Sequence, residues 1–382
     1  MVLQSSPVTL IQGGDPAWDE WLGRADRDVY HGAAYHGFSQ ACAEGDPYLI
    51  VAGTRDRGLA WPYLLRRVDA IAALQGSPAT DVGSVYGYPG PLAWGCRPGD
   101  EFLAQAWFAV AGVWRDQGAV TAFTRFHPLL DNASLLSGLE WSSERPDGDR
   151  DPVIAVGPTV SVDCTLDDDT ARGLYARALR QHIAAGRRAG LVTVVDENWN
   201  ALEAFGALYR ETMARNGAAA YYFFDASYFH RLVVALSGHI HLLVTKLGDV
   251  VAAAGLFTEF NGIVQAHLVG TNGDLRALSP FKVLLDDARA WARARGNVVL
   301  HLGGGRGGRE DSLLRFKAEF SPRRHLFQVG RWMLDPTSCR DLLSARLAAL
   351  PPGRTLDATF FPAYRAPEIE AAEPHAPRVA RS

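Results

Sequence analysis

Two features of the sequence contain residue types that can do chemistry, namely eleven histidines and a glycine run at 303–308. None of the histidines has the H-E-x-x-H spacing, or another spacing typical of a metal site, so we expect no metal. The glycine run lacks the G-x-x-x-x-G-K-[ST] pattern of a nucleotide loop. A neutral histidine can take a proton from an ammonium nucleophile, because its unperturbed pKa is about 6.5. His127, at the end of a predicted strand, is a candidate for that role. The alternative is a strand-end histidine that holds a backbone hydrogen bond.

Two groups of basic residues are the second candidate for function. Residues 172–188 contain five arginines and no acidic residue. Such groups can hold a nucleic-acid backbone, and ordinary solvated faces are the alternative. The net charge of −4 indicates no basic field over the whole protein. The groups are Arg172, Arg177, Arg180, Arg187 and Arg188, and then Arg306, Arg309, Arg315, Lys317, Arg323 and Arg324.

The composition is that of a globular protein with a large core. Of 382 residues, 48% are apolar and 21% charged, which excludes a disordered chain and a small disulfide-rich protein. The length predicts two domains or one large doubled one. Four cysteines without C-x-x-C spacing are typical of a reducing compartment. The start of the sequence has no signal-peptide pattern, and its longest apolar run, 250–257, is too short to cross a bilayer. We therefore expect a cytoplasmic protein.

The second half of the sequence has the clearest pattern of elements. Strands are predicted at 239–246, 250–260 and 263–270, and Asn261-Gly262 predicts a type I′ hairpin turn between the last two. After a loop at 271–278, Ser279 as N-cap and Pro280 predict the start of a helix that ends near Arg295. A buried strand at 297–302, a short helix at 311–319 and a final strand at 325–334 follow.

The first half repeats this order of elements. Strands are predicted at 48–52 and 59–68, an extended segment at 81–94, a helix at 100–117 and a strand at 120–126. The repetition favours an internal duplication. Between the halves, a long basic helix at 170–185 precedes a second helix at 201–216, and the composition of 366–382 predicts a disordered tail. The fold class expected is α/β (α+β), with mixed sheets in two tandem domains at 1–165 and 166–334. A segment at 335–365 is a candidate for completing the first.

Three motifs in this sequence resemble those of the Fem family and the broader BioF2-like acetyltransferase group. They are Leu302-Gly303-Gly304-Gly305 with Arg315-Phe316-Lys317-Ala318-Glu319-Phe320, then Leu208-Tyr209-x-x-Thr212-x-x-Arg215 with Tyr228-Phe229, and Tyr86-Gly87-Tyr88-Pro89-Gly90-Pro91-Leu92. The resemblance covers about residues 35–335. Fem proteins form peptide bonds from aminoacyl-tRNA and have a doubled GNAT (N-acetyltransferase-like) fold. The resemblance therefore implies tandem GNAT-like domains.

The resemblance also implies a mechanism in which an acceptor amine attacks the acyl ester directly, without a covalent enzyme intermediate. In Fem proteins the lysine of the F-K-x-x-F motif lies beside the aminoacyl-tRNA end, which implies a catalytic role for Lys317. A cation there offsets the negative charge that develops on the ester. The alternative is a solvated lysine paired with Glu319 or Asp311. Where Fem proteins have an I-D-P-like segment with a catalytic Asp, this sequence has Phe126-His127-Pro128.

The expected activity is transfer of an aminoacyl group from tRNA to an amine acceptor. An acyl-coenzyme A N-acyltransferase and a non-catalytic binding module of the same fold are the alternatives. The loop before Ser279 lacks the Q/R-x-x-G-x-G/A run that holds the pyrophosphate of coenzyme A, which disfavours the first alternative. Fem enzymes of cell-wall assembly bind their precursor through a first-domain lysine, and this sequence has no lysine before Lys246. A small amine or a peptide is thus the favoured acceptor over a cell-wall precursor.

The candidate site residues follow from these motifs. We expect no bound cofactor, aminoacyl-tRNA as co-substrate (acyl-coenzyme A in the alternative), and no membrane span. A monomer is compatible with the sequence. For the aromatic residues and for His267 and His301, core packing is the competing interpretation. Beside the catalytic candidates Lys317 and His127, the donor-binding candidates are Arg180, Arg187, Arg188, Ser279, Arg315, Phe316 and Phe320, and the acceptor-binding candidates are Tyr86, Tyr88, Tyr222, His267, Gly303 and Gly304.

Overall fold

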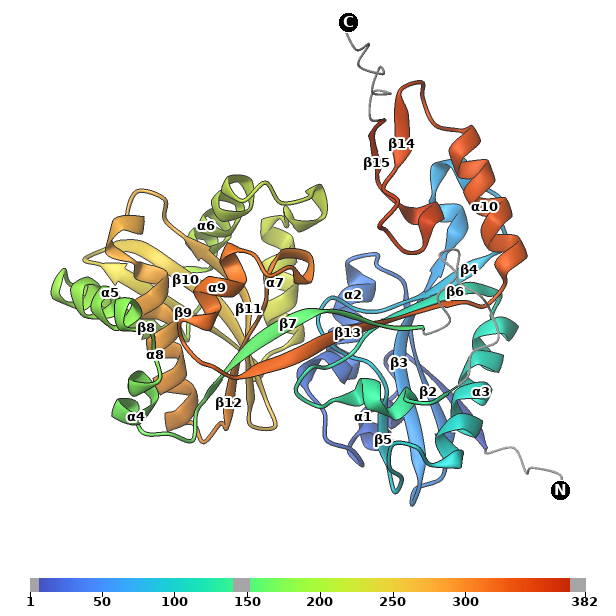
Figure 1. The fold of residues 1–382 in the computed structure, drawn as a ribbon, viewed down its shortest axis with the longest axis horizontal. Coiled ribbons are helices and arrows are strands. Elements are labelled where there is room, and N and C mark those ends of the chain that lie inside the picture. Colours follow the sequence, from blue (N-terminus) through green and yellow to red (C-terminus); the bar gives the residue numbers. More distant parts are fainter. Residues whose placement is uncertain (1–6, 140–151, 372–382) are drawn as a thin grey trace, which may run out of the picture.

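One mixed sheet runs through the whole protein and is flanked by helices (Figure 1). The computed structural model describes residues 7–139 and 152–371. Thirteen strands form the sheet, in the order β1-β2-β3-β4-β6-β13-β7-β12-β11-β10-β9-β8, with β5 paired to β3. The predicted fold class is therefore confirmed, although the two expected sheets are hydrogen-bonded into one.

Each half contains the same succession of elements. A strand is followed by two helices, three antiparallel strands, a helix and a strand that pairs in parallel with the third of the three. The first strand and the second helix of each succession, and the first helix of the first half, were not predicted. In the first half these are β1 (Val8–Gln12), α1 (Ala17–Leu22), α2 (Ala33–Ala41), β2 (Asp46–Gly53), β3 (Gly58–Arg67), β4 (Thr80–Gly83), α3 (Glu101–Asp116) and β6 (Ala119–Arg125), with β5 (Leu92–Trp94) beside β3. In the second they are β8 (Leu191–Val195), α6 (Leu202–Arg215), α7 (Ala226–Ala235), β9 (Ile240–Leu247), β10 (Val250–Phe260), β11 (Ile263–Thr271), α8 (Pro280–Ala294) and β12 (Val299–Gly304).

Two long strands cross between the halves and join their sheets. β7 (Val153–Asp163) comes from the first half of the chain but pairs with β12 of the second. β13 (Arg324–Met333) follows the second half but pairs with β6 of the first, and the two crossing strands pair with each other. Figure 1 shows both strands running between the two lobes. The final strand predicted at 325–334 thus exists, but it extends the first sheet.

Aromatic residues fill the cores on both sides of this crossing. Trp332 on β13 packs at 4.9 Å from Trp107 on α3 and at 5.7 Å from Trp61 on β3, measured between ring centroids. A second core spans the halves, where Phe38 on α2 meets Tyr228 on α7 at 5.0 Å. Because buried aromatic area is a large part of core stability, these contacts fix how the halves sit against each other.

The basic helix predicted at 170–185 is two helices, α4 (Asp168–Gly173) and α5 (Arg177–Arg188). Asp167 caps the first of them by accepting from the backbone of Asp169 and Thr170. Gly186 lies inside α5, where a Cβ would sit only 2.8 Å from the carbonyl oxygen of Leu278. This glycine therefore lets α5 pack closely on the turn before α8.

The start of α8 confirms the N-cap position predicted for Ser279, but its side chain does not cap the helix. Pro280 occupies the first helical position, as expected, but Ser279 has a left-handed backbone (φ 55°) and its side chain makes no capping hydrogen bond. The last turn before the helix, Arg276–Leu278, is a 3-10 turn that closes onto the nitrogen of Ser279.

The C-terminal segment returns to the first half. α10 (Pro336–Ala348) packs against β6 and a 3-10 turn at Ala72–Leu74. A strand pair, β14 (Arg354–Leu356) with β15 (Glu368–Glu370), follows. Residues 366–371 are therefore ordered, which shortens the tail that was predicted from 366, and 372–382 lie outside the described residues. No helix in the described part of the chain combines the length and apolar character needed to cross a bilayer.

Candidate active site

The strands β11 and β12 diverge in the middle of the second half. They pair in parallel through three positions, the last being Gln265 with His301. Beyond it, β11 continues beside β10 alone, while β12 continues beside β7. His267 forms a bulge in β11, because Ala266 and Leu268 pair with successive residues of β10 and leave it without a partner. Gln265 and His301 thus lie where the strands part.

A buried polar network joins the two halves at this point. Oδ2 of Asp28 lies 2.9 Å from Nε2 of His127 and accepts a hydrogen bond of 2.7 Å from Nε2 of Gln265. The side-chain oxygen of Gln265, Oε1, lies 2.6 Å from Nδ1 of His301. All four side chains are buried. Hydrogen bonding of this kind is what allows polar groups inside a core.

The hydrogen bonds of His127 contradict its predicted role as a general base. Its Nδ1 accepts from the backbone N–H groups of Leu129 and Leu130, at 3.2 and 3.3 Å, so the ring proton sits on Nε2 and is donated to Asp28. The neutral ring therefore has no free lone pair with which to accept a proton. The alternative stated above, a strand-end histidine held by the backbone, describes it better.

His301 has the opposite pattern. The amide nitrogen of Gln265 must face the Asp28 carboxylate, so its oxygen faces His301 and requires a proton on Nδ1. Nε2 of His301 then carries the lone pair, and it has no hydrogen-bond partner among the described residues. Burial, followed by the nearby His127 and Lys317, lowers the pKa of His301 well below its usual value.

Lys317 lies beside Gly303 and Gly304 at the end of β12. Its Nζ donates a hydrogen bond of 2.7 Å to the carbonyl oxygen of Gly304. Burial lowers the pKa of Lys317 to about 8, against a smaller raising effect of Asp311. A Cβ on Gly303, which has φ 74°, would meet Nζ of Lys317 at 3.4 Å and the hydroxyl of Tyr88 at 3.6 Å. The ammonium and the phenol therefore converge on one spot.

The solvated-lysine alternative for Lys317 does not hold. Asp311 caps α9 (Ser312–Ala318) and bonds Arg306, and Glu319 pairs with Lys282 at 2.8 Å. Neither acid forms an ion pair with Lys317. The lysine is instead half-buried against backbone carbonyl and glycine.

The acceptor candidates gather around His267. Its Nδ1 lies 3.1 Å from the hydroxyl of Tyr30, and its Nε2 lies 3.4 Å from that of Tyr35. Burial lowers the pKa of His267 to about 4, so the ring is neutral. Tyr86 packs at 5.7 Å from His267 and 6.2 Å from Tyr222 between ring centroids. The structure thus brings Tyr86, Tyr222 and His267 together beside Tyr88, and their role in binding stays a prediction.

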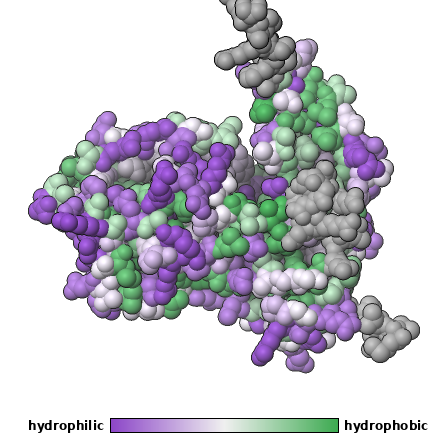
Figure 2. Space-filling view, viewed as in Figure 1, coloured by the Kyte–Doolittle hydropathy of each residue, from purple (hydrophilic) through white to green (hydrophobic). Residues whose placement is uncertain are grey.

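The donor candidates other than Phe320 lie on a face made by α5, the start of α8 and α9. Lys282 links these elements, since its Nζ lies 3.1 Å from Nδ1 of His182 on α5 and 2.8 Å from Glu319 after α9. Phe316 stacks on Phe281 at 5.4 Å. In Figure 2, hydrophilic side chains gather on the outer end of this half, where α5 lies in Figure 1. Such a face suits a charged ligand.

Within that face the arginines differ. Arg187 is held by Asp286 at 2.7 Å and by Asp287, so it is largely committed to ion pairs. Arg180 and Arg188 are exposed and form no ion pair within 7–139 and 152–371, and Arg315 is exposed as well. Phe320 is 1% exposed and packs on Tyr175, which makes it a core residue.

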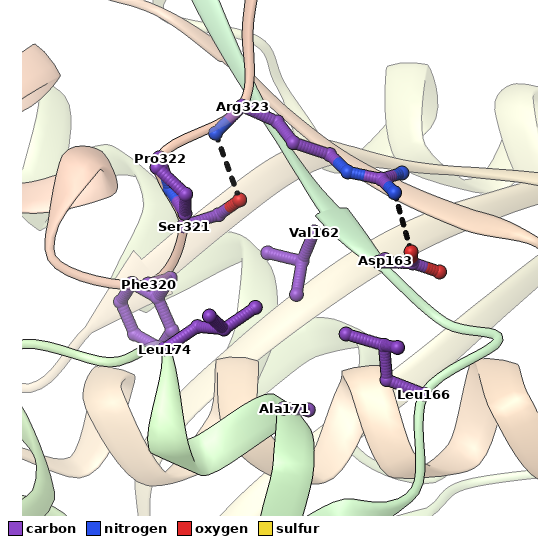
Figure 3. A pocket seen from close by; sticks show the side chains of 9 residues that line it. All are labelled: Val162, Asp163, Leu166, Ala171, Leu174, Phe320, Ser321, Pro322 and Arg323. Carbon is purple, nitrogen blue, oxygen red and sulfur yellow. Dashed lines mark hydrogen bonds and ion pairs between the residues drawn. The ribbon is translucent and has the colours of Figure 1, made fainter.

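A shallow pocket lies apart from this network, between α4, the end of β7 and the turn that precedes β13 (Figure 3). Its edge is closed by an ion pair between Arg323 and Asp163. Phe320 is the one site candidate that lines it. The remaining lining is Val162, Leu166, Ala171, Leu174, Ser321 and Pro322. Within the described residues, no group of three potential ligands is arranged to hold a metal ion.

Comparison with known proteins agrees with this topology. Residues 167–317 match the family described as "Acetyltransferase (GNAT) domain". The crystal structure of FemX is similar over 87% of this chain and 99% of that chain, with a TM-score of 0.64 and 14% identity. The protein has a Fem-like tandem GNAT fold. A conserved protein of unknown function from Bacteroides thetaiotaomicron shares the fold over 85% of this chain and 99% of its own, with a TM-score of 0.52 and 11% identity. No curated protein matches the sequence.

Sequence reasoning missed two members of the buried network of this tandem GNAT fold, Asp28 and Gln265, and favoured core packing for His301. Gln265 and His301 each interrupt an otherwise apolar strand, in Ile263-Val264-Gln265 and Leu300-His301-Leu302, and that interruption is a usable signal. Asp28 lies in a stretch with no strand or helix pattern and gives no such signal.

Proposed function

We propose that the protein forms an amide bond by transferring an aminoacyl group from aminoacyl-tRNA to an amine acceptor. The observation that carries the proposal is the position of Lys317. This cation is part of the F-K-x-x-F motif, and its Nζ converges with the Tyr88 hydroxyl at Gly303, where β12 leaves β11. A fixed cation in a partly buried site stabilises an oxyanion more strongly than one in water.

In the proposed reaction the donor ester enters where β11 and β12 diverge. The acceptor amine attacks the ester carbonyl carbon, the new C–N bond forms, and the C–O bond to the tRNA ribose breaks. Lys317 offsets the negative charge on the carbonyl oxygen, because its ammonium is held by Gly304 and cannot turn away. The acceptor lies against the aromatic residues around His267, with Tyr86 and Tyr222 on its side.

Charged tRNA is the favoured donor because of the face formed by α5, α8 and α9. Arg180, Arg188 and Arg315 are exposed there and can contact phosphates. The loop before α8 has no glycine-rich pyrophosphate run, and Ser279 does not cap the helix. We propose no bound cofactor, and a small amine or a peptide as acceptor, because the first half has no lysine for the diphosphate of a cell-wall precursor.

An acyl-coenzyme A donor is the second candidate. It is favoured by the match of residues 167–317 to the acetyltransferase domain family and by the divergence of β11 from β12. A gap between two such strands admits a pantetheine arm as well as an aminoacyl end.

The test compares donors directly. Purified protein is incubated with a panel of primary amines and either bulk tRNA charged with isotope-labelled amino acids or acetyl-coenzyme A, and products are identified by mass. We expect an amino-acid increment that ribonuclease abolishes. Transfer of an acetyl group from the purified thioester without RNA would replace the leading proposal with the second candidate. Absence of turnover with both donors would favour a binding module.

A further inference from the structure

We propose that His301 is the catalytic residue that takes the proton from the attacking amine, in the role that the sequence suggested for His127. The inference rests on the proposed amide-forming function and adds a proton acceptor to it. It stands on three observations, namely the hydrogen-bond order of the buried network, the unpartnered Nε2 of His301 and the place of this residue at the divergence of two strands.

The network determines which nitrogen of His301 is free. Oδ2 of Asp28 accepts from two side chains, His127 and Gln265, so it fixes both in orientation. Gln265 can then offer only its oxygen to His301, and Nδ1 must hold the ring proton. The result is a chain of four side chains that ends in a lone pair on Nε2. A buried acceptor without a partner costs free energy, which a protein tolerates where a ligand will occupy it.

The surroundings of His301 suit a proton acceptor. Tyr88 packs edge-on at 5.4 Å between ring centroids, and Lys317 and His325 add positive or potentially positive charge from α9 and β13. His325 does not compete for Nε2, because its own Nε2 lies 2.7 Å from the hydroxyl of Ser161 on β7. Burial, together with the nearby His127, Lys317 and His325, lowers the pKa of His301 well below its usual value, so the ring is neutral and its lone pair is available at physiological pH.

The position of His301 places it beside the reacting atoms. It is the last residue of β12 that pairs with β11, and Gly303, where Lys317 and Tyr88 converge, lies two residues further on. The Tyr88 ring, which packs against Tyr30, His127, His301 and Phe327, lines the same space. The donor carbonyl then lies between Lys317 and His301.

The proton balance of the step is complete without another reactant. As the amine nitrogen bonds to the carbonyl carbon, one N–H proton moves to Nε2 of His301. As the C–O bond breaks, that proton passes to the ribose oxygen, which leaves as a hydroxyl. His301 returns to the neutral form with its proton on Nδ1, still donated to Gln265.

The variant His301→Asn tests the proposal most sharply. The asparagine amide nitrogen can replace Nδ1 as the donor to Gln265, whereas nothing replaces Nε2. We expect kcat to fall by roughly 10²–10⁴-fold, the range for loss of a general base, with KM for donor and acceptor nearly unchanged. The acidic limb of the kcat profile, which lies well below pH 6.5 in the parent protein, should disappear. His241→Asn, at a half-buried histidine on β9, is the matched control and should keep its kcat.

The outcomes separate this proposal from the function it rests on. A parent protein that turns over charged tRNA and a His301→Asn variant that matches its kcat would overturn the role of His301 and leave the function standing. A parent protein that is inactive with both donors would overturn the function and the base together. Should the variant fail to fold, ring ¹⁵N shifts of His301 in the parent protein decide the matter. A spectrum in which Nδ1 is protonated and Nε2 is unprotonated would support the proposal. A proton on Nε2 would overturn it.

Discussion

The carboxylate of Asp28 lies 2.9 Å from the imidazole Nε2 of His127, 99 positions away in the chain, and both side chains are buried. The two residues follow different elements of the first half, and Gln265 connects them to the second. This pair therefore does more than fill a core. It sets the orientation of every group that follows in the network, up to His301.

Asp28→Asn should destabilise the fold and slow the reaction. The amide would bring a donor to a place where His127 and Gln265 already donate, and leaving buried polar groups without an acceptor costs about 1–3 kcal/mol each. Urea unfolding measures the loss of stability and kcat measures the loss of the oriented His301. Asp26→Asn, at an exposed position two residues away, is the control. Equal stability of the two variants would mean that Asp28 does not hold His127 and Gln265 in place.

Lys317→Met should keep the fold and lower kcat by about 10²-fold or more, equivalent to about 2.7 kcal/mol of transition-state stabilisation. The methionine keeps most of the apolar stem and removes the ammonium, with its charge and its hydrogen bond to Gly304. Because burial lowers the pKa of Lys317 to about 8, the ammonium is lost as the pH rises through that value. Activity of the parent protein should therefore decline above pH 8.

Lys246→Met on β9 serves as the control for that experiment, since this half-buried lysine lies outside the site. An unchanged rate for Lys317→Met at saturating donor would leave the lysine with a structural role toward Gly304 alone.

Gly303→Ala should reduce activity more than stability. The left-handed backbone of Gly303 costs about 1–2 kcal/mol for any other residue, and the new methyl would stand 3.4 Å from Nζ of Lys317. Gly238→Ala offers a matched control, because its φ of 82° gives a similar backbone cost and a methyl there meets nothing within 4 Å. Thermal unfolding should show similar shifts for both, and kcat should fall only for Gly303→Ala. Parallel losses of kcat would argue that the space beside Gly303 is not used.

The double variant Arg180→Ala/Arg188→Ala should weaken tRNA binding and its dependence on salt. Both arginines are exposed on α5 without an ion pair in the described chain, so each is able to release counterions from a phosphate. Filter binding of bulk uncharged tRNA between 50 and 200 mM salt should show a slope smaller by about one to two.

Arg187→Ala is the informative contrast, because that arginine is held by Asp286 and Asp287. Its loss should lower stability by uncovering the buried Asp286 and should change the salt slope little. A double variant with the parent slope would remove α5 from the proposed tRNA face.

Local patterns predicted the elements that have local causes. The hairpin of β10 and β11 turns at Asn261-Gly262 with φ of 44° and 77°, as the residue types required. The strand β7 was missed because Gly157 and Pro158 lie in its middle and are read as breakers. Gly157 is needed there, since a Cβ would lie 1.8 Å from the carbonyl oxygen of Gly308.

The site residues also divide into those that local patterns indicate and those that depend on how the halves pack. Lys317 and the tyrosines could be found because short motifs contain them, and motifs are local. The link from Asp28 to Gln265 spans 237 positions and depends on how two halves pack, so no pattern in the sequence indicates it. The base was assigned to His127 because a sequence does not show which ring nitrogens are hydrogen-bonded. Only those hydrogen bonds distinguish a histidine with a free lone pair from one without.

The crossing of β7 and β13 has a consequence for how the protein is made. The first half leaves the ribosome first, but its sheet edge at β6 and its tryptophan core wait for β13 and Trp332. Until β13 has been translated, β6 presents an open edge, the kind of surface that invites wrong pairing. A chain that stops before residue 332 thus lacks part of the core of its own first half.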